Sequence, residues 1–467
     1  MKSEIGLIGL GVMGKSLSRN LARNGFKLSV YNRHVDEKEE NVAANFKGSF
    51  PELNDALAFD KLEDFVKSLE LPRKIILMVN AGAAVDSVLT DLNQILDPKD
   101  IIIDAGNSHF EESTKRMNRL KENGIYLIGT GVSGGEFGAL NGPSVMPSGE
   151  LEAYKLVQKY LESISAKDSN NHPCCTYVGT EGSGHFVKMI HNGIEYVEMQ
   201  LLAECYFIMK NQKLSNEQIA DELEKWSGVL NSYLLSITID ILRKKEGDVF
   251  LLDNILDKAA NKGTGKWATM VISDSGQSST LIPAALFARY LSFFKSKREM
   301  AAALFSEELN KSELNLNHLK QAYFFSRVIN HHQGFELINN VSTQNQWNIN
   351  LSEIARIWTE GCIVKSDLMK DLVQTLKNKP SIMYQEPWTN KLKESYSALQ
   401  SVVLSCIKNQ VYIPCMLEAL NYFNGLKTAE SSANLIQAQR DFFGAHTYKK
   451  KNDPSETNYH TQWGDEI

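Results

Sequence analysis

Apolar and polar positions follow two different periods along the chain, and the change of period divides it into two parts. Up to residue 181, short apolar runs typical of buried strands alternate with segments that have apolar residues at helical spacing. The runs expected to be strands are residues 4–8, 27–31, 74–79, 101–104, 125–129 and 176–179. Strands that alternate with helices predict a parallel sheet covered by helices, as in a Rossmann-type domain.

From residue 182 onward the apolar period is close to 3.6, and Pro283 is the only proline between Cys174 and Lys379. We therefore expect an α/β domain over residues 1–181 and a large all-helical domain over residues 182–443. Beyond residue 204, helices are expected at residues 214–245, 248–260, 281–296, 313–343 and 351–378. The remaining residues, 444–467, form a polar C-terminal tail with too few apolar side chains to bury itself. It is either disordered or held by another surface.

The loop after the first expected strand has the spacing Gly-x-Gly-x-x-Gly and consists of Gly9, Leu10, Gly11, Val12, Met13 and Gly14. In a strand–helix–strand unit this spacing indicates a dinucleotide site. Gly9 allows the tight turn, Gly11 lets a pyrophosphate approach the backbone, and Gly14 lets helix and strand pack closely. The alternative is three glycines in an ordinary turn.

The end of the second expected strand distinguishes the two nicotinamide cofactors. Asn32, Arg33 and His34 follow this strand, and no acid occurs before Asp36. Enzymes that use NAD usually have an acid there for the ribose 2′-hydroxyl, whereas a guanidinium suits a 2′-phosphate. The sequence therefore favours NADP.

Small and polar residues also follow three later strands, at the edge where open α/β sheets bind ligands. These candidates are Val79, Asn80, Ala81, Asn107, Ser133, Gly134 and Gly135. The hydroxyl and free backbone N–H groups of residues 133–135 suit an anion, although plain turn chemistry would use the same residues. The glycine-spaced loop with Lys262 and Thr264 is either a phosphate cradle or a flexible surface turn.

One helical segment, residues 182–204, carries polar groups on a single stripe. Lys188, His191, Asn192 and Glu195 follow the i, i+3, i+4, i+7 pattern, so a cation, an imidazole, an amide and a carboxylate face the same space. Such a stripe usually means a solvated face with salt bridges. Histidine and asparagine between apolar residues suggest a wet cleft instead.

Composition narrows the function classes. The 467 residues carry a net charge of −6, which gives no basic footprint for nucleic acid. Six cysteines show neither metal-ligand spacing nor a disulfide framework, so no metal site is expected and the thiols suggest the cytoplasm. No signal-peptide pattern opens the chain, and no apolar run approaches the ~20 residues of a membrane span.

Over essentially its whole length the chain resembles the 6-phosphogluconate dehydrogenases (decarboxylating). The most specific matches are residues 184–196, 262–267 and 437–448, supported by the glycine motif, Asn32-Arg33 and residues 133–135. The resemblance implies a homodimer that uses NADP and 6-phosphogluconate, in which the C-terminal tail reaches the partner subunit.

The resemblance also implies residue roles. Lys188 is the base on the 3-hydroxyl during hydride transfer to NADP, and Glu195 is the acid that protonates C1 of the enediol after CO2 leaves. Such a base needs a depressed pKa, while β-keto acids lose CO2 without a metal if the enolate is stabilised. The implied substrate contacts are Asn107, Ser133, Gly134, Gly135, His191, Asn192, Tyr196, Lys262, Thr264, Arg289 and, from the partner, Arg440 and His446.

Several positions depart from the family pattern. His34 replaces a threonine, Asn80 a lysine, Phe137 a glutamate and Leu140 an arginine, and residues 275 and 359–360 also differ. None removes a proposed catalytic group, so cofactor affinity and selectivity are more in doubt than the reaction. The alternatives are a β-hydroxyacid dehydrogenase for a smaller, unphosphorylated acid and a catalytically idle NADP-binding scaffold.

Overall fold

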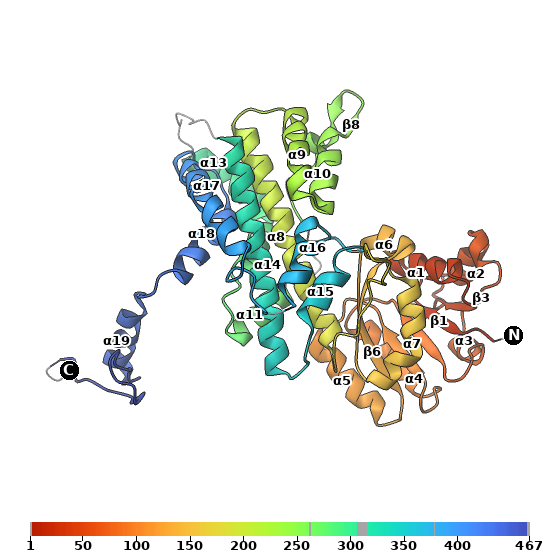
Figure 1. Ribbon diagram of the computed structural model, residues 1–467. Coiled ribbons are helices and arrows are strands. Elements are labelled where there is room, and N and C mark those ends of the chain that lie inside the picture. The colour runs from red at the N-terminus through yellow and green to blue at the C-terminus, as the bar shows by residue number, and fades with distance from the viewer. Residues whose placement is uncertain (1, 261–262, 306–314, 378, 465–467) are drawn as a thin grey trace. The chain divides into compact units, whose positions relative to one another are not determined.

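The computed structural model describes residues 2–260, 263–305, 315–377 and 379–464 (Figure 1). Residues 1–418 form one compact unit and residues 419–467 a second, and each is described by itself. Because the first unit contains both the sheet and most of the helices, the boundary expected between residues 181 and 182 stays a prediction. In the described part of the chain, no helix is long and apolar enough to cross a membrane.

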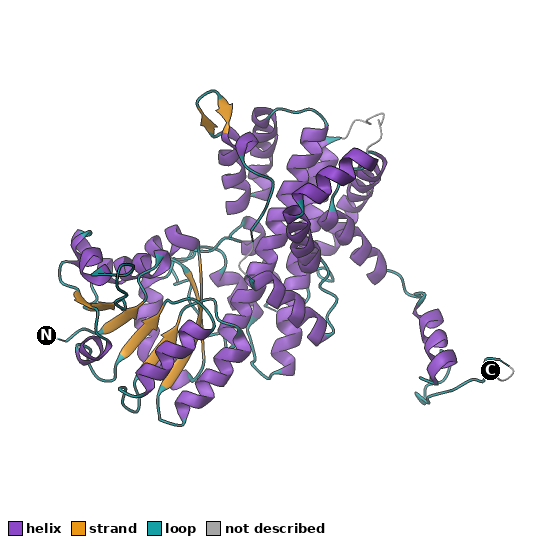
Figure 2. Cartoon of the chain, turned by 180° about the vertical axis from the view of Figure 1, so that it is seen from behind, coloured by secondary structure: helices purple, strands orange, loops and turns teal. Residues whose placement is uncertain are grey.

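The N-terminal part of the first unit is built on a seven-stranded sheet of order β3-β2-β1-β4-β5-β6-β7 (Figures 1 and 2). Strands β1 to β6 pair in parallel, and β7 is antiparallel to β6. The strands are β1 Ile5–Ile8, β2 Leu28–Tyr31, β3 Leu57–Phe59, β4 Lys74–Leu77, β5 Ile101–Asp104, β6 Tyr126–Ser133 and β7 Ser144–Ser148.

Helices cover both faces of this sheet. One apolar cluster packs the sheet against α1 and α7, through residues such as Leu17 and Val157. The other packs it against α3, α4 and α5, through Phe65, Leu89 and Leu120. The helices are α1 Val12–Arg23, α2 Val42–Gly48, α3 Leu62–Lys67, α4 Ala83–Asn93, α5 Phe110–Lys121, α6 Gly135–Asn141 and α7 Leu151–Ile164, with a 3-10 turn η1 at Pro51–Leu53. The predicted Rossmann-type architecture is confirmed.

Two strands of this sheet, β3 and β7, were not predicted, and the prediction of a strand at 176–179 is wrong. That segment lies beside β7, where the N–H of Val178 donates to the carbonyl of Pro147, but only isolated bridges form. Pro147 has no N–H on the side that faces the segment, so a continuous ladder cannot form.

The helical part centres on two 29-residue helices, α8 (Ser183–Asn211) and α14 (Leu316–Gln344). They pack closely, because a Cβ on Gly334 would lie 2.5 Å from the side chain of Ile194. Around them lie α9 Asn216–Leu230, α10 Tyr233–Arg243, α11 Thr264–Ser275, α12 Leu281–Phe293, α13 Lys295–Phe305, α15 Leu351–Ile357, α16 Asp367–Thr375 and α17 Trp388–Lys408. The next helix, α18 (Pro414–Leu426), crosses the boundary between the two units. The predicted large helical part is confirmed, whereas its limits at residues 182 and 443 stay a prediction.

Its expected helix limits need three corrections. Ser232 caps a new helix through the amide of Leu235, so residues 214–245 form α9 and α10. Ser366 caps α16 in the same way, which splits residues 351–378. The helix expected at 248–260 is wrong, because a turn at Gly247, with φ +60°, joins β8 (Lys245–Glu246) to β9 (Val249–Phe250), and only the 3-10 turn η2 (Leu251–Asn254) follows.

The second unit contains α19 (Ala433–Gly444) and the C-terminal segment. This segment was expected to be either disordered or held by another surface, and it closes on α19. The buried carboxylate of Asp441 accepts hydrogen bonds from the side chains of His460 and Trp463 and from two backbone amides, those of Thr447 and Thr461. A polar tail can therefore be ordered by one buried acceptor. Large apolar side chains of α19 stay exposed, namely Leu435, Ile436, Phe442 and Phe443.

Candidate active site

The predicted stripe on α8 forms a compact cluster at the carboxyl end of β6. Lys188 Nζ lies 2.6 Å from Asn192 Oδ1, 3.3 Å from His191 Nδ1 and 3.3 Å from Ser133 Oγ. His191 Nε2 lies 3.1 Å from the same Ser133 oxygen. The Lys188 amine, the imidazole and the hydroxyl are buried, so this stripe is not a solvated face.

Glycines on both sides allow α8 to approach β6 this closely. A Cβ on Gly131 would lie 2.5 Å from Lys188 Cβ, and one on Gly184 would lie 2.2 Å from the carbonyl of Met146. Gly134, with φ +112°, places its Cα against the carbonyl of Gly361, where a Cβ would lie 2.6 Å from the oxygen. The backbone of residues 131–134 therefore holds Ser133 beside the Lys188 amine.

Burial sets the protonation of the two cluster bases. It lowers the pKa of Lys188, and the Glu195 carboxylate acts in the opposite direction. Burial, followed by the charge of Lys188, holds the pKa of His191 well below its usual range. A neutral imidazole protonated on Nε2 satisfies both its contacts, because it accepts from Lys188 and donates to Ser133.

Glu195 lies one turn beyond Asn192, on the same face of α8. Its carboxylate is 3.8 Å from His191 Nδ1, and its side chain is 21% exposed while that of His191 is fully buried. The cluster therefore pairs a desolvated amine with a carboxyl group that reaches water. A base and a separate acid can act on the two sides of one bound molecule.

A second group of candidates meets further along α8. The guanidinium of Arg289 on α12 stacks 3.5 Å above the ring of Tyr196. Thr264 opens α11, and the next residue, Gly265, lies against the Tyr196 ring, where a Cβ would come within 2.7 Å. A guanidinium, a phenol and the first turn of a helix are groups that suit a phosphate.

Three candidates lie outside the described part of the first unit. Lys262 lies outside the described residues. Arg440 and His446 belong to the second unit, where Arg440 donates to Gln437 Oε1 at 3.1 Å and His446 lies edge-on to Phe443.

A cavity of about 500 Å³ opens along the carboxyl ends of β1, β2 and β4. Of the predicted cofactor contacts, it is lined by Gly9, Leu10, Gly11, Asn32, Arg33, Val79 and Asn80. Val12, Met13, Gly14, His34, Ala81 and Asn107 are not among its lining residues.

The three glycines of the motif differ in their surroundings. Gly9 has φ +97°, and a Cβ there would meet the carbonyl of Met78 at 2.5 Å. On Gly14 a Cβ would lie 1.9 Å from the carbonyl of Gly9, so the start of α1 packs on the turn. A Cβ on Gly11 would meet nothing within 4 Å, which leaves its backbone open to the cavity. These residues fit a dinucleotide pyrophosphate.

Sequence reasoning missed an acid at this cavity. Glu39 folds back to the end of β2, where Oε1 accepts from Arg33 at 3.0 Å and Oε2 accepts from Asn32 at 2.9 Å. Asn32 in turn accepts from the amide of Leu10 at 3.1 Å. Hydrogen bonds from Arg33 and Asn32 lower the pKa of Glu39, so its carboxylate is ionised at neutral pH.

The loops after β4 and β5 are joined by Arg116, a second residue that the sequence did not reveal. Its buried guanidinium donates to Asp86 at 2.7 Å, to Ser108 Oγ at 3.3 Å and to the carbonyl of Gly82 at 3.4 Å. Asp104 accepts from Ser108 at 2.6 Å. Arg116 thus fixes the loops that carry Asn80 and Asn107 relative to each other.

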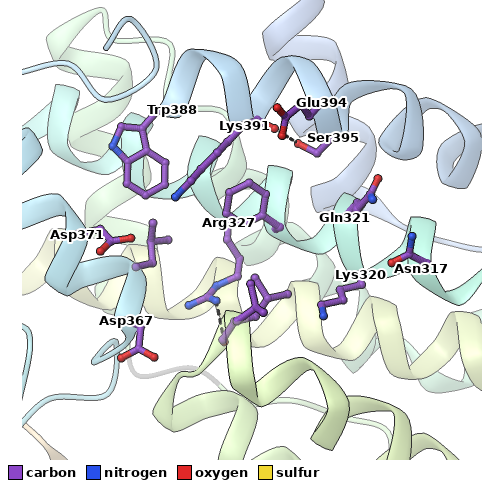
Figure 3. A pocket seen from close by; sticks show the side chains of 14 residues that line it. Asn317, Lys320, Gln321, Arg327, Asp367, Asp371, Trp388, Lys391, Glu394 and Ser395 are labelled. Atoms are coloured by element: carbon purple, nitrogen blue, oxygen red, sulfur yellow. Dashed lines mark hydrogen bonds between the residues drawn. The ribbon is translucent and has the colours of Figure 1, made fainter. Parts of the chain in front are cut away.

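Another cavity, of about 400 Å³, lies within the helical part (Figure 3). Arg327 on its wall is 3.0 Å from Glu198, and Asp367 is 2.9 Å from Lys370, so both charges are neutralised. The other charged groups of its lining balance one another: they are Lys320, Lys391, Asp371 and Glu394. The charges of this lining cancel, so the cavity favours neither anionic nor cationic ligands, and none of the predicted candidates that the structure describes lines it.

Comparison with known proteins agrees with this arrangement. Residues 4–179 match the NAD binding domain of 6-phosphogluconate dehydrogenase, and residues 184–463 match its C-terminal domain. The chain is 40% identical to the decarboxylating 6-phosphogluconate dehydrogenase of Escherichia coli, covering 99% of this chain and 100% of the relative. It is 41% identical to an NAD(+)-dependent, decarboxylating 6-phosphogluconate dehydrogenase of Bacillus subtilis, with full coverage of both.

A solved structure of the same family also matches the chain over nearly its whole length. Plasmodium falciparum 6-phosphogluconate dehydrogenase, studied in its apo form and with NADP+ and 6-phosphogluconate, superposes with a TM-score of 0.93 at 38% identity, over 98% of this chain and 100% of that one. The family models together span nearly the whole sequence. The chain therefore belongs to the 6-phosphogluconate dehydrogenase family.

Proposed function

We propose that this protein oxidatively decarboxylates 6-phosphogluconate to ribulose 5-phosphate and CO2, with reduction of NADP, as a cytoplasmic enzyme of the pentose phosphate pathway. The observation that carries the proposal is the buried Lys188 amine, 3.3 Å from Ser133 and 2.6 Å from Asn192. A fully solvated lysine, with a pKa of about 10.4, is almost entirely protonated at neutral pH and is a poor base there.

The reaction divides between two groups on α8. Lys188 takes the proton of the substrate 3-hydroxyl while the hydride of C3 leaves to the nicotinamide, which supplies the oxidising equivalent when bound. The resulting 3-keto acid breaks its C1–C2 bond, CO2 leaves, and the electron pair forms an enediol. Lys188, now an ammonium, stabilises the developing charge on the C3 oxygen and returns its proton to that oxygen, which completes the enediol. Glu195 protonates the carbon that carried the carboxylate.

Other residues hold the sugar acid and the cofactor. Asn192, His191 and residues 133–135 bind the hydroxyls and the carboxylate, and Asn107 lies between substrate and cofactor. Tyr196, Thr264, Arg289 and Lys262 bind the 6-phosphate. Arg33 takes the 2′-phosphate of NADP, and the glycine loop takes the pyrophosphate.

The activity is tested by following reduced nicotinamide on addition of 6-phosphogluconate, together with release of CO2 from substrate labelled at C1. Glu195→Gln separates the steps, because it impairs protonation of the carbon that carried the carboxylate (C2 of the substrate, C1 of the enediol) more than it impairs the oxidation. A smaller β-hydroxyacid that is turned over faster than 6-phosphogluconate would favour the wider dehydrogenase class. Absence of turnover with every acid, although nucleotide binds, would favour a scaffold.

We further propose a homodimer in which Arg440 and His446 complete the phosphate site of the partner. The exposed apolar side chains of α19 support this proposal, because an unpartnered face of Leu435, Ile436 and Phe443 is costly in water. The six unpaired, buried cysteines support the cytoplasmic location.

Complementation tests the shared site. Arg440→Ala and Lys188→Met chains are each inactive, but a mixed dimer has one site with both residues intact. Equal amounts refolded together should recover about a quarter of wild-type activity, since half the dimers are mixed and each has one good site. No recovery, with mixed dimers shown to be present, would place Arg440 in the site of its own chain.

A further inference from the structure

The ribose end of the cofactor cavity carries a carboxylate where the sequence shows only a cation. Glu39 follows β2 by eight residues, and a turn closed by mutual hydrogen bonds between the backbones of Val35 and Glu39 returns it to the strand end. Its two oxygens are held by Arg33 and Asn32, at 3.0 and 2.9 Å. This is the end of the second strand, where dinucleotide folds place the adenosine ribose.

The charges around this cavity do not favour an additional phosphate. Among its lining residues in the described chain, Arg33 is the only lysine or arginine, whereas Glu39 and Asp91 are both acids. Asn80 contributes an amide and no charge. The lining thus carries a net negative charge before any nucleotide enters.

We propose that Glu39 is a specificity-determining residue: it accepts the ribose 2′-hydroxyl of NAD, opposes the 2′-phosphate of NADP, and so makes both nucleotides usable. The inference rests on the proposed function only in naming the reaction in which the nucleotide is used. Arg33 still favours NADP, and Glu39 reduces the ratio of kcat/KM for NADP to that for NAD.

The physical argument compares what each nucleotide meets. A 2′-hydroxyl donates to a carboxylate, which is the contact that NAD enzymes commonly use. A 2′-phosphate brings about two negative charges next to the Glu39 carboxylate. Arg33 has five N–H donors and gives one of them to Glu39, so it can serve the phosphate without leaving the acid. The like charges of Glu39 and the phosphate remain close together.

Glu39→Gln tests the proposal, because it removes the charge and keeps the shape. We expect the ratio of kcat/KM for NADP to that for NAD to rise about tenfold, the usual size of one charge-assisted contact. Glu40→Gln is the matched control, since Glu40 lies on the same turn and accepts from the amide of Glu37 at 2.8 Å. That variant should leave the ratio unchanged.

Binding measurements keep this test independent of turnover. Calorimetric titration with 2′-AMP and AMP should show that Glu39→Gln gains affinity for 2′-AMP and loses affinity for AMP. An unchanged ratio of the two affinities, or a loss confined to 2′-AMP, would overturn the proposal, the latter because Glu39 would then act by positioning Arg33. If 6-phosphogluconate is not turned over with either nucleotide, the proposed function fails while these titrations still decide the role of Glu39.

Discussion

The Lys188 cluster and the Arg33–Glu39 pair are both predicted to meet the substrates, yet they are held in opposite ways. Lys188 is buried on a 29-residue helix whose neighbours leave no room for a side chain at Gly131. Arg33 lies in a loop after a four-residue strand, and its side chain is 70% exposed. Desolvation changes the chemistry of the first group, whereas solvent and salt weaken the second. Substitutions in the Lys188 cluster should therefore lower activity more than substitutions of Arg33 or Glu39.

The largest effect is expected from Lys188→Met, which replaces the buried amine by an apolar side chain of similar length. Loss of the base should lower kcat by about 10²–10⁴, measured as formation of reduced nicotinamide. Lys210→Met, at the far end of the same helix, is the control and should keep normal turnover. A Lys188→Met enzyme with near-normal kcat would remove the assignment of this residue as base.

Gly131→Ala should disturb the cluster without touching any of its polar groups. The added methyl would lie 2.5 Å from Lys188 Cβ and 2.9 Å from the carbonyl of Gly184, so α8 must move away from β6. A displacement of about 1 Å is enough to lower kcat by about 10². Gly228→Ala in α9, where a Cβ meets nothing within 4 Å, should leave kcat unchanged and raise stability by up to about 1 kcal/mol.

Arg33→Ala tests how much the exposed Arg33 side chain contributes to the use of NADP. The loss of kcat/KM for NADP should correspond to about 1.5–3 kcal/mol, one hydrogen bond to a charged group, while the value for NAD stays nearly constant. Added salt should reduce the difference between wild type and variant, because the guanidinium is largely exposed. Equal losses for both nucleotides would show that Arg33 does not contact the 2′-phosphate.

Asn192→Asp should change the pH profile more than the maximum rate. A carboxylate 2.6 Å from Lys188 Nζ stabilises the ammonium and raises the pKa that burial has lowered. The neutral amine then forms only at higher pH, so the acid limb of kcat/KM should move up by about 1–3 units. Asn192→Ser removes the hydrogen bond without adding charge and is the control. If both variants keep the wild-type limb, Lys188 is not the group that titrates.

The sequence predicted what depends on periodicity and missed what depends on contacts between distant segments. Lys188, His191, Asn192 and Glu195 could be assigned to one face of α8 because helical spacing is regular. Ser133 followed from its place at a strand end. The turn that returns Glu39 to Arg33 has no periodic pattern, so the sequence did not predict that Glu39 lies beside Arg33.

The predicted helix limits were wrong for the same reason. The apolar pattern continues through Ser232 and Ser366, and only their side-chain hydrogen bonds to the following turn reveal that new helices start there. The order produced in the C-terminal segment by Asp441 also depends on contacts 19 to 22 residues away. Composition alone cannot show that a single buried carboxylate orders a polar tail.

Helix α8 also fixes the distance between the two groups proposed to bind opposite ends of the substrate. Lys188 and Tyr196 are eight residues apart on one uninterrupted helix, so their backbones are about 12 Å apart along its axis. No hinge lies between them that could shorten this span. A phosphorylated acid with fewer carbons would reach either the amine or the phosphate groups, but not both at once. If Lys188 and Tyr196 bind the substrate as proposed, the pitch of this helix would select the number of carbons in the substrate.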